Sequence, residues 1–172
     1  LEDITERSKD YAASLGERLR ERIYDEVVPD LAEAIAEARD LDNPTRDELD
    51  ETYQMALVTL YRLLFIAYAE DERFLPRYNP SYERRSLKQT AHELHDIITN
   101  DDTEFDSQSP TYWDETMALV DAIHHGRSSW GLPEYDGTLL SSDSSVSKTG
   151  GLLDEIELTD DQFGPILANL LI

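Results

Sequence analysis

Two histidines one helical turn apart are the residue types in this sequence that best suit metal chemistry. His92 and His95 flank Glu93 and Leu94, and this i, i+3 spacing puts both imidazoles on one helix face. Zinc proteases of the His-Glu-x-x-His class space their histidines four residues apart and need a further ligand. Glu93 or Asp96 could supply it, but an acidic helix face of this kind favours a solvated surface. We therefore assign no metal ligand and keep a metal-dependent helical enzyme as an alternative.

The tetrapeptide Asn-Pro-Ser-Tyr at 79–82 is the second stretch whose residue types could take part in catalysis. Adenine-N6 methyltransferases use an Asn/Asp-Pro-Pro-aromatic loop, whose polar side chain holds the amino group while the aromatic ring stacks on the flipped base. Here Ser81 stands in the third position, no hydrophobic strand precedes Asn79, and the sequence lacks a Gly-rich turn for a methyl donor. The tetrapeptide is predicted to be a turn, with no catalytic and no cofactor-binding residue.

A local group of basic side chains is the remaining candidate for binding. Such side chains could contact the phosphates of DNA, although in an acidic chain they often pair with nearby carboxylates. We assign them a possible contact with the DNA backbone. The group consists of Arg73, Arg77, Arg84, Arg85 and Lys88.

Composition limits the classes of protein that remain. The 172 residues suffice for one domain with a buried core, and 38 acidic against 15 basic residues give a net charge of −23. Excess acid, scarce lysine and 40% apolar residues predict adaptation to a salt-saturated, haloarchaeal cytoplasm, where added salt screens the repulsion between charges. The sequence has no cysteine, which excludes disulfides, thiolate metal sites and cysteine nucleophiles. No signal peptide or lipidation motif is visible, which predicts a cytoplasmic protein.

The elements that must position these residues are predicted to be helices. The run from Met55 to Ala69 is apolar nearly all the way round a helix, so it needs cover on several sides. It is shorter than the roughly 20 residues that cross a bilayer and contains Arg62, so no membrane span is expected. Thr45 and Glu48 offer a capping box. We predict one long central helix at 45–72.

The rest of the chain shows helical spacing or turn signals, without strand alternation of any length. We therefore predict an all-α fold, a multi-helix bundle of five to seven helices around the central one. Before the central helix we expect a helix over 2–41, divided by Pro29 near Val28. After it we expect a loop over 73–85 that its three aromatics pin to the core, and then a helix from the Ser86 cap to Thr99 with Leu87, Ala91, Leu94 and Ile98 inward. A helix from Pro110 to Gly126 follows, then an irregular region over 127–151 whose second half (141–151) is mobile, and a last helix from Thr159, where Gln162 completes a capping box.

We expect these elements to form a single domain, 1–172. The sequence opens with Leu1 rather than Met and stops at Ile172 inside an apolar helical pattern, so a fragment of a larger chain is expected. Its expected parts are an N-terminal helical arm (1–41), a central bundle (45–126), an irregular loop region (127–158) and the start of a C-terminal helix (159–172).

Several short motifs, in order, carry a resemblance to a known family. The stretch Leu-Tyr-Arg-Leu-Leu-Phe-Ile-Ala-Tyr-Ala-Glu-Asp at 60–71, followed by Phe-Leu-Pro at 74–76, resembles the "LYRLLFLLYAED…LLP" stretch of Type IIG-like restriction-modification enzymes and of phage-defence N6-adenine DNA methyltransferases. Tyr82 with Ser86-Leu87 is similar to their "Y…YSL". Residues 131–140 (Gly-Leu-Pro-Glu-Tyr-Asp-Gly-Thr-Leu-Leu) resemble their "lPaYNGGLF" loop, and residues 152–167 fit the pattern that follows.

The resemblance covers roughly residues 50–170 and implies a connector. In that family this region is the helical segment between an N-terminal nuclease and the methyltransferase, so the resemblance implies a non-catalytic scaffold that positions catalytic domains on DNA. The parent would use S-adenosylmethionine and could use Mg²⁺, whereas this fragment would hold no cofactor. Its partners would be the adjacent nuclease and methyltransferase domains, and DNA through the parent, with no membrane. The alternative is a free-standing helical interaction domain without an enzymatic parent.

Overall fold

The computed structural model describes residues 16–100 and 104–172, and within them the regular structure is helical. No strand occurs in these two ranges, where only an isolated bridge joins Arg127 and Leu132. The predicted all-α class is confirmed. The elements are η1 (Ile23–Val27), α2 (Val28–Arg39), α3 (Arg46–Asp71), α4 (Pro80–Glu83), α5 (Leu87–Thr99), α6 (Thr111–His125), η2 (Ser128–Trp130), α7 (Lys148–Asp154) and α8 (Asp160–Leu171).

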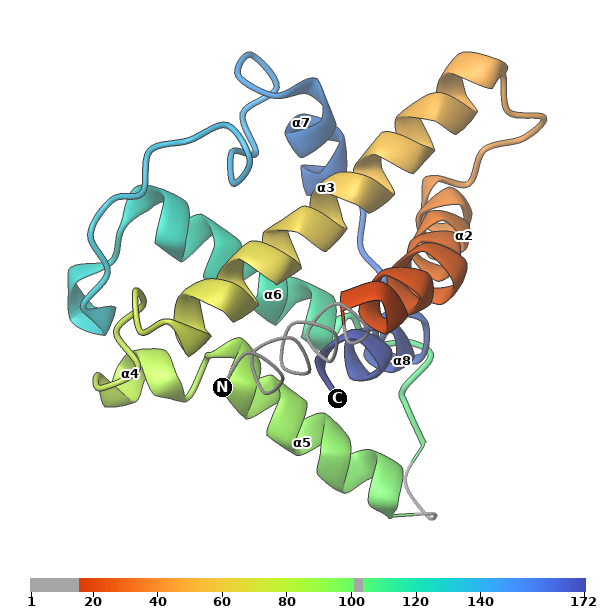
Figure 1. Ribbon diagram of the computed structural model, residues 1–172. Helices are drawn as coiled ribbons and strands as arrows, with labels where there is room; N and C mark the ends of the chain where they lie inside the picture. Colours follow the sequence, from red (N-terminus) through yellow and green to blue (C-terminus); the bar gives the residue numbers. More distant parts are fainter. Residues whose placement is uncertain (1–15, 101–103) are drawn as a thin grey trace, which may run out of the picture.

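Helix α3 is the long central element that the sequence predicts. It spans 26 residues, and the Thr45 hydroxyl and Glu48 carboxylate form the expected capping box at its start. Figure 1 shows α3 running diagonally across the molecule, and it packs against α2, α5 and α7. Its apolar run is not covered on every side, because Tyr61 and Tyr68 are exposed.

The predicted division at Pro29 is absent, because the backbone stays helical through Val27 and Val28, and the helix instead widens just before the proline. Residues 16–22 are α-helical, η1 is a π-helical turn, and α2 continues to Arg39. Proline has no backbone N–H to donate to the preceding turn. The N–H of Val28 bonds instead to the carbonyl of Ile23, five residues earlier, so the helix changes its winding just before Pro29.

Helix α8 is a second centre of the core, in addition to α3. It packs against η1, α2, α5 and α6, and its capping box of Thr159 and Gln162 is present as predicted. Phe163 is fully buried with its ring edge-on to Trp113 of α6, the centroids 5.1 Å apart. The Asp160 carboxylate accepts from the N–H of Tyr112, which supplies α6 with the N-terminal cap that its own Pro110 cannot provide.

Two predictions about burial are wrong. In the segment 73–85, Tyr82 is fully buried, but Phe74 and Tyr78 are 64% and 85% exposed, so one aromatic rather than three holds this segment to the core. In α5, Ile98 is 51% exposed, because the helix extends beyond its neighbours at that end, whereas Leu87 and Leu94 are buried as expected. A periodic apolar pattern identifies a helix face but does not fix how far along the helix the cover extends.

The segment 141–151, predicted to be mobile, folds onto the core. Ser141 and Gly150 are buried, and the Ser147 hydroxyl caps α7, which packs against α3. The Lys148 ammonium lies 2.9 Å from the Glu51 carboxylate on α3. The polar residues of this segment form turns and a helix cap. Among the described residues, no helix is long and apolar enough to cross a membrane.

Candidate functional site

Arg62, near the middle of α3, is a buried cation bound to carbonyl groups far away in the chain. Its Nε donates to the carbonyl of Leu139 at 2.8 Å and its Nη2 to the carbonyl of Ser141 at 2.9 Å. Its Nη1 lies 3.8 Å from the Met117 sulfur on α6. Burial lowers the pKa of Arg62, and nearby Asp154 opposes that shift. Arg62 therefore fixes the 139–141 loop against α3 and α6.

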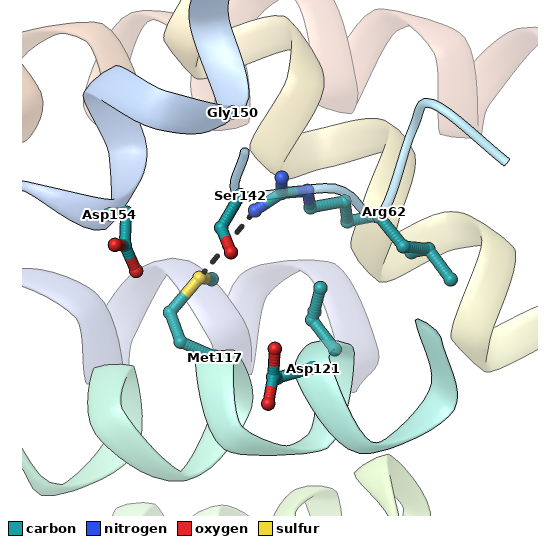
Figure 2. A pocket seen from close by; sticks show the side chains of 8 residues that line it. Arg62, Met117, Asp121, Ser142, Gly150 and Asp154 are labelled. Atoms are coloured by element: carbon teal, nitrogen blue, oxygen red, sulfur yellow. Dashed lines mark hydrogen bonds between the residues drawn. The ribbon is translucent and has the colours of Figure 1, made fainter. Parts of the chain in front are cut away.

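A small cavity lies beside this arginine. Figure 2 shows Arg62 directed toward Met117, and Asp154, Asp121 and Ser142 also line the cavity. Its volume of about 70 Å³ is room for water molecules and too small for an organic substrate. We therefore interpret the Arg62 site as a structural joint between three segments.

Glu70, at the end of α3, is the matching buried anion. Its Oε2 accepts from the N–H of Leu87 at 2.9 Å and from the Tyr82 hydroxyl at 2.8 Å, and its Oε1 accepts from the N–H of Lys88 at 3.0 Å. These amides are the first two of α5, so a carboxylate sits at the positive end of that helix. Burial nevertheless raises the pKa of Glu70, and the hydrogen bonds only partly offset it.

The short motifs that carry the family resemblance are joined by these two side chains. Arg62 and Glu70 belong to the stretch 60–71, Leu139 to the loop 131–140, and Tyr82 and Leu87 to the segment between them. From the sequence, Arg62 served as an argument against a membrane span, and Arg62 and Glu70 were otherwise only members of the motif at 60–71. The sequence did contain a signal for both residues, because each is a charged residue at a position of the helix that faces the core. A charge buried there needs a hydrogen-bonding partner.

The five basic residues predicted to contact DNA have different surroundings, and two of them pair with carboxylates. Arg77 makes two hydrogen bonds with the Glu83 carboxylate, at 2.9 and 3.0 Å, and Lys88 lies 2.6 Å from Asp71. Arg73 is exposed on the turn after α3, where its φ is +63°. Only Arg84 and Arg85 line a shared cleft.

That cleft contains two residues that sequence analysis did not select, Arg127 and Trp130. The Cζ atoms of Arg85 and Arg127 lie 4.6 and 4.5 Å from the centroid of the Trp130 ring. Arg84 also lines the cleft, as do Glu93 of α5 and Glu115 of α6. Burial raises the pKa of Glu115, Glu93 and Asp160 add smaller contributions in the same direction, and Arg85 opposes them. The cleft measures about 280 Å³.

The turn at 126–132 holds Arg127 and Trp130 in place. Arg127 and Leu132 exchange two backbone hydrogen bonds, at 2.9 and 3.0 Å. Gly126 and Gly131 have φ angles of +78° and +76°, which a side chain would strain. A Cβ on Gly126 would lie 2.8 Å from the backbone nitrogen of Glu134, so the two passes of the chain can approach only at glycine.

The two other motifs with chemical potential are ordinary structure. Asn79 caps α4 through a hydrogen bond from the N–H of Ser81, and the ring of Tyr82 is fully buried, so the tetrapeptide forms the start of a one-turn helix where a turn was predicted. His92 and His95 are exposed, with His92 4.0 Å from Asp96. Within 16–100 and 104–172 no group of three His, Cys, Asp or Glu side chains could hold a metal ion.

No protein-family model, curated protein or solved structure matches this chain.

Proposed function

We propose that this chain is a non-catalytic helical connector of a DNA restriction-modification enzyme, holding catalytic domains in fixed relation on DNA. The parent is an S-adenosylmethionine-dependent adenine methyltransferase, cytoplasmic and haloarchaeal, which could also carry a Mg²⁺-dependent nuclease. The partners of the connector are those adjacent domains, and DNA through the parent. The proposal takes its family from the resemblance of residues 50–170 and its mechanical role from the structure.

One observation carries the mechanical part of the proposal. The two buried charged side chains of α3 form hydrogen bonds that hold three segments against this helix. Arg62 binds the loop that contains Leu139, and Glu70 binds Tyr82 and the start of α5. Hydrogen bonds between a buried charge and backbone groups are directional and costly to leave unmade. A connector has to transmit position between its two ends, and such joints resist bending.

The experiment that tests the proposal reads the gene around this segment. We expect the same reading frame to continue beyond Ile172 into a methyltransferase whose Asn-Pro-Pro-aromatic motif follows a predicted strand. A stop codon close to Ile172 would contradict the connector role. In a second test, the chain is incubated with DNA and labelled S-adenosylmethionine, and no methyl transfer is expected because the donor site lies in the adjacent domain.

A specific observation favours the alternative, a free-standing interaction domain. Tyr53, Tyr61 and Tyr68 are exposed along one side of α3, and the Tyr68 ring lies 6.3 Å from that of exposed Phe74. Exposed aromatic residues are enriched where proteins bind other proteins. The reading-frame test separates the two proposals, because an interaction domain without an enzymatic parent needs no downstream methyltransferase.

A further inference from the structure

The cleft around Trp130 holds cations that form no salt bridge, although the Glu115 carboxylate in the same cleft interacts electrostatically with Arg85. Among residues 16–100 and 104–172, no carboxylate lies within ion-pairing distance of Arg84, Arg85 or Arg127. Elsewhere in the same ranges Arg39, Arg77, Lys88 and Lys148 each pair with an acid, whereas Arg20, Arg22, Arg46 and Arg73 form no salt bridge. The three cleft arginines differ from these because they line one cleft together. In a chain with 38 acidic residues, three neighbouring guanidinium groups without such a partner suit an external anion.

The geometry of the cleft favours a phosphate over a simple carboxylate. Arg85 and Arg127 lie over the Trp130 ring, so their planar groups are held before any ligand arrives. Guanidinium forks match the tetrahedral oxygens of a phosphate with paired hydrogen bonds, and a phosphate can engage more than one fork at once. Arg85 uses one Nη1 donor on the carbonyl of Ser81, and its other N–H groups remain for the ligand.

Two carboxylates in the lining of the cleft limit which phosphate compounds fit. Glu93 and Glu115 repel a second anionic group but can accept hydrogen bonds from amino groups. A volume of about 280 Å³ suits a single nucleotide. A nucleotide also presents one phosphate at one end and, in adenine or cytosine, an amino group at the other.

We propose that Arg84, Arg85 and Arg127, arranged around Trp130, form a binding site for the phosphate of a nucleotide. That this phosphate belongs to DNA rests on the proposed function above. The site differs from the group predicted by sequence, because Arg127 joins it, whereas Arg77 and Lys88 are each paired with a carboxylate.

The test titrates the whole chain with adenosine monophosphate and, separately, with a short single-stranded DNA oligonucleotide. Salt weakens phosphate contacts, so the titrations use the lowest KCl concentration at which circular dichroism stays native. The chain has two tryptophans, which give two indole N–H signals in NMR spectra. The Trp130 signal should shift on binding, whereas the Trp113 indole, bonded to the carbonyl of Ile156 outside the cleft, should not.

Single variants locate the ligand. Arg127→Gln and Arg84→Gln should each raise Kd about tenfold, because each removes a charge-assisted contact. Arg46→Gln makes the same change in net charge at the exposed start of α3, outside the cleft, and should leave Kd within about twofold. Thermal unfolding of all three variants checks that the fold is intact.

The outcomes separate this inference from the proposed function. Binding of both ligands, weakened by the cleft variants, supports the site and its DNA role. Binding of the mononucleotide alone supports the site and counts against DNA as its partner. Binding of DNA that the cleft variants leave unchanged overturns the site while the connector proposal stands. Failure of both ligands to shift the Trp130 signal, or equal binding of an oligoglutamate peptide, overturns the phosphate site.

Discussion

At the scale of single residues, two buried charged side chains contribute more to the structure than the histidine pair or the Asn-Pro-Ser-Tyr stretch. Arg62 and Glu70 lie eight residues apart on α3, and both are at most 2% exposed. Among the described residues, no buried side-chain nitrogen or oxygen lacks a hydrogen-bond partner. Removing one partner of such a group costs far more than the net value of the bond, because the other group remains buried and unpaired.

We predict that Glu70→Ala lowers the free energy of unfolding by about 3 kcal/mol. The substitution leaves the amides of Leu87 and Lys88 and the Tyr82 hydroxyl without their acceptor. Chemical denaturation at neutral pH measures the loss. Glu72→Ala, at an exposed position two residues along, is the control and should change stability by less than about 0.5 kcal/mol. Equal effects of the two substitutions would contradict the role of Glu70.

Glu70 should also make stability depend on pH. Burial raises its pKa above the ordinary value of 4.5, so the folded state binds this proton more tightly than the unfolded chain does. The contribution of Glu70 to the unfolding free energy therefore falls as pH rises from about 4.5 through the raised pKa. Unfolding of the wild type and of Glu70→Gln across this range gives the difference. We expect their difference in stability to change with pH only in that window.

Arg62→Lys should lower the free energy of unfolding by about 2 kcal/mol, because one ammonium cannot reproduce the two directed bonds to the carbonyls of Leu139 and Ser141. Hydrogen exchange should rise selectively in residues 139–154, which this joint holds. Arg46→Lys, at an exposed position on the same helix, serves as the control. Uniform exchange across the chain would show that Arg62 does not act on this loop in particular.

At the scale of elements, the position of α7 against α3 depends on a close contact between two backbone segments, at Gly150 and at Ser141. Gly150, in the first turn of α7, is buried, and a Cβ there would lie 1.9 Å from the carbonyl oxygen of Ser141. That oxygen is an acceptor for Arg62. The position of α7 and the arginine joint are therefore coupled through a single carbonyl group.

We predict that Gly150→Ala destabilises the fold by about 3 kcal/mol, because the backbone carbonyl cannot move without breaking its bond to Arg62. Gly16→Ala is the matched control. Gly16 lies in a helix with nothing within 4 Å of the added Cβ, so alanine should stabilise the protein by about 0.5–1 kcal/mol. Thermal unfolding of both variants measures the contrast. A stabilising Gly150→Ala would show that α7 is not held in this way.

At the scale of the whole molecule, the net charge of −23 opposes compaction of the chain. The acids are spread over the helices, so their mutual repulsion is a property of the entire surface. Salt screens exposed charges and acts little on buried ones, which leaves the joints at Arg62 and Glu70 intact. The surface and the interior should therefore respond differently to ionic strength.

We expect the thermal midpoint to rise with KCl concentration, because screening removes surface repulsion from the folded state. Circular dichroism across a KCl series measures the midpoint. The loss of stability caused by Glu70→Ala should be nearly the same at low and high salt, because its hydrogen bonds are buried. A midpoint independent of salt would contradict the predicted adaptation to high salt.

Helix boundaries are the part of the fold that the sequence determined by itself. Thr45 with Glu48, Ser86, Gly126 and Thr159 with Gln162 each act within a few residues of their own position, so local chemistry fixed these helix ends. The start of α6 is the exception, because its cap comes from the distant Asp160. The apolar spacing likewise identified α3 as the central helix.

Only the tertiary structure decided which distant groups meet. Arg62 finds its carbonyl partners 77 and 79 residues away, and Arg127 shares the Trp130 ring with Arg85 from a different element. Helical periodicity gives the face on which a side chain lies but not the segment that packs against that face. The packing partner is chosen by two conditions that the whole folded chain must meet together. Each buried charge needs a hydrogen-bonding partner, and each close contact between two backbones needs a glycine.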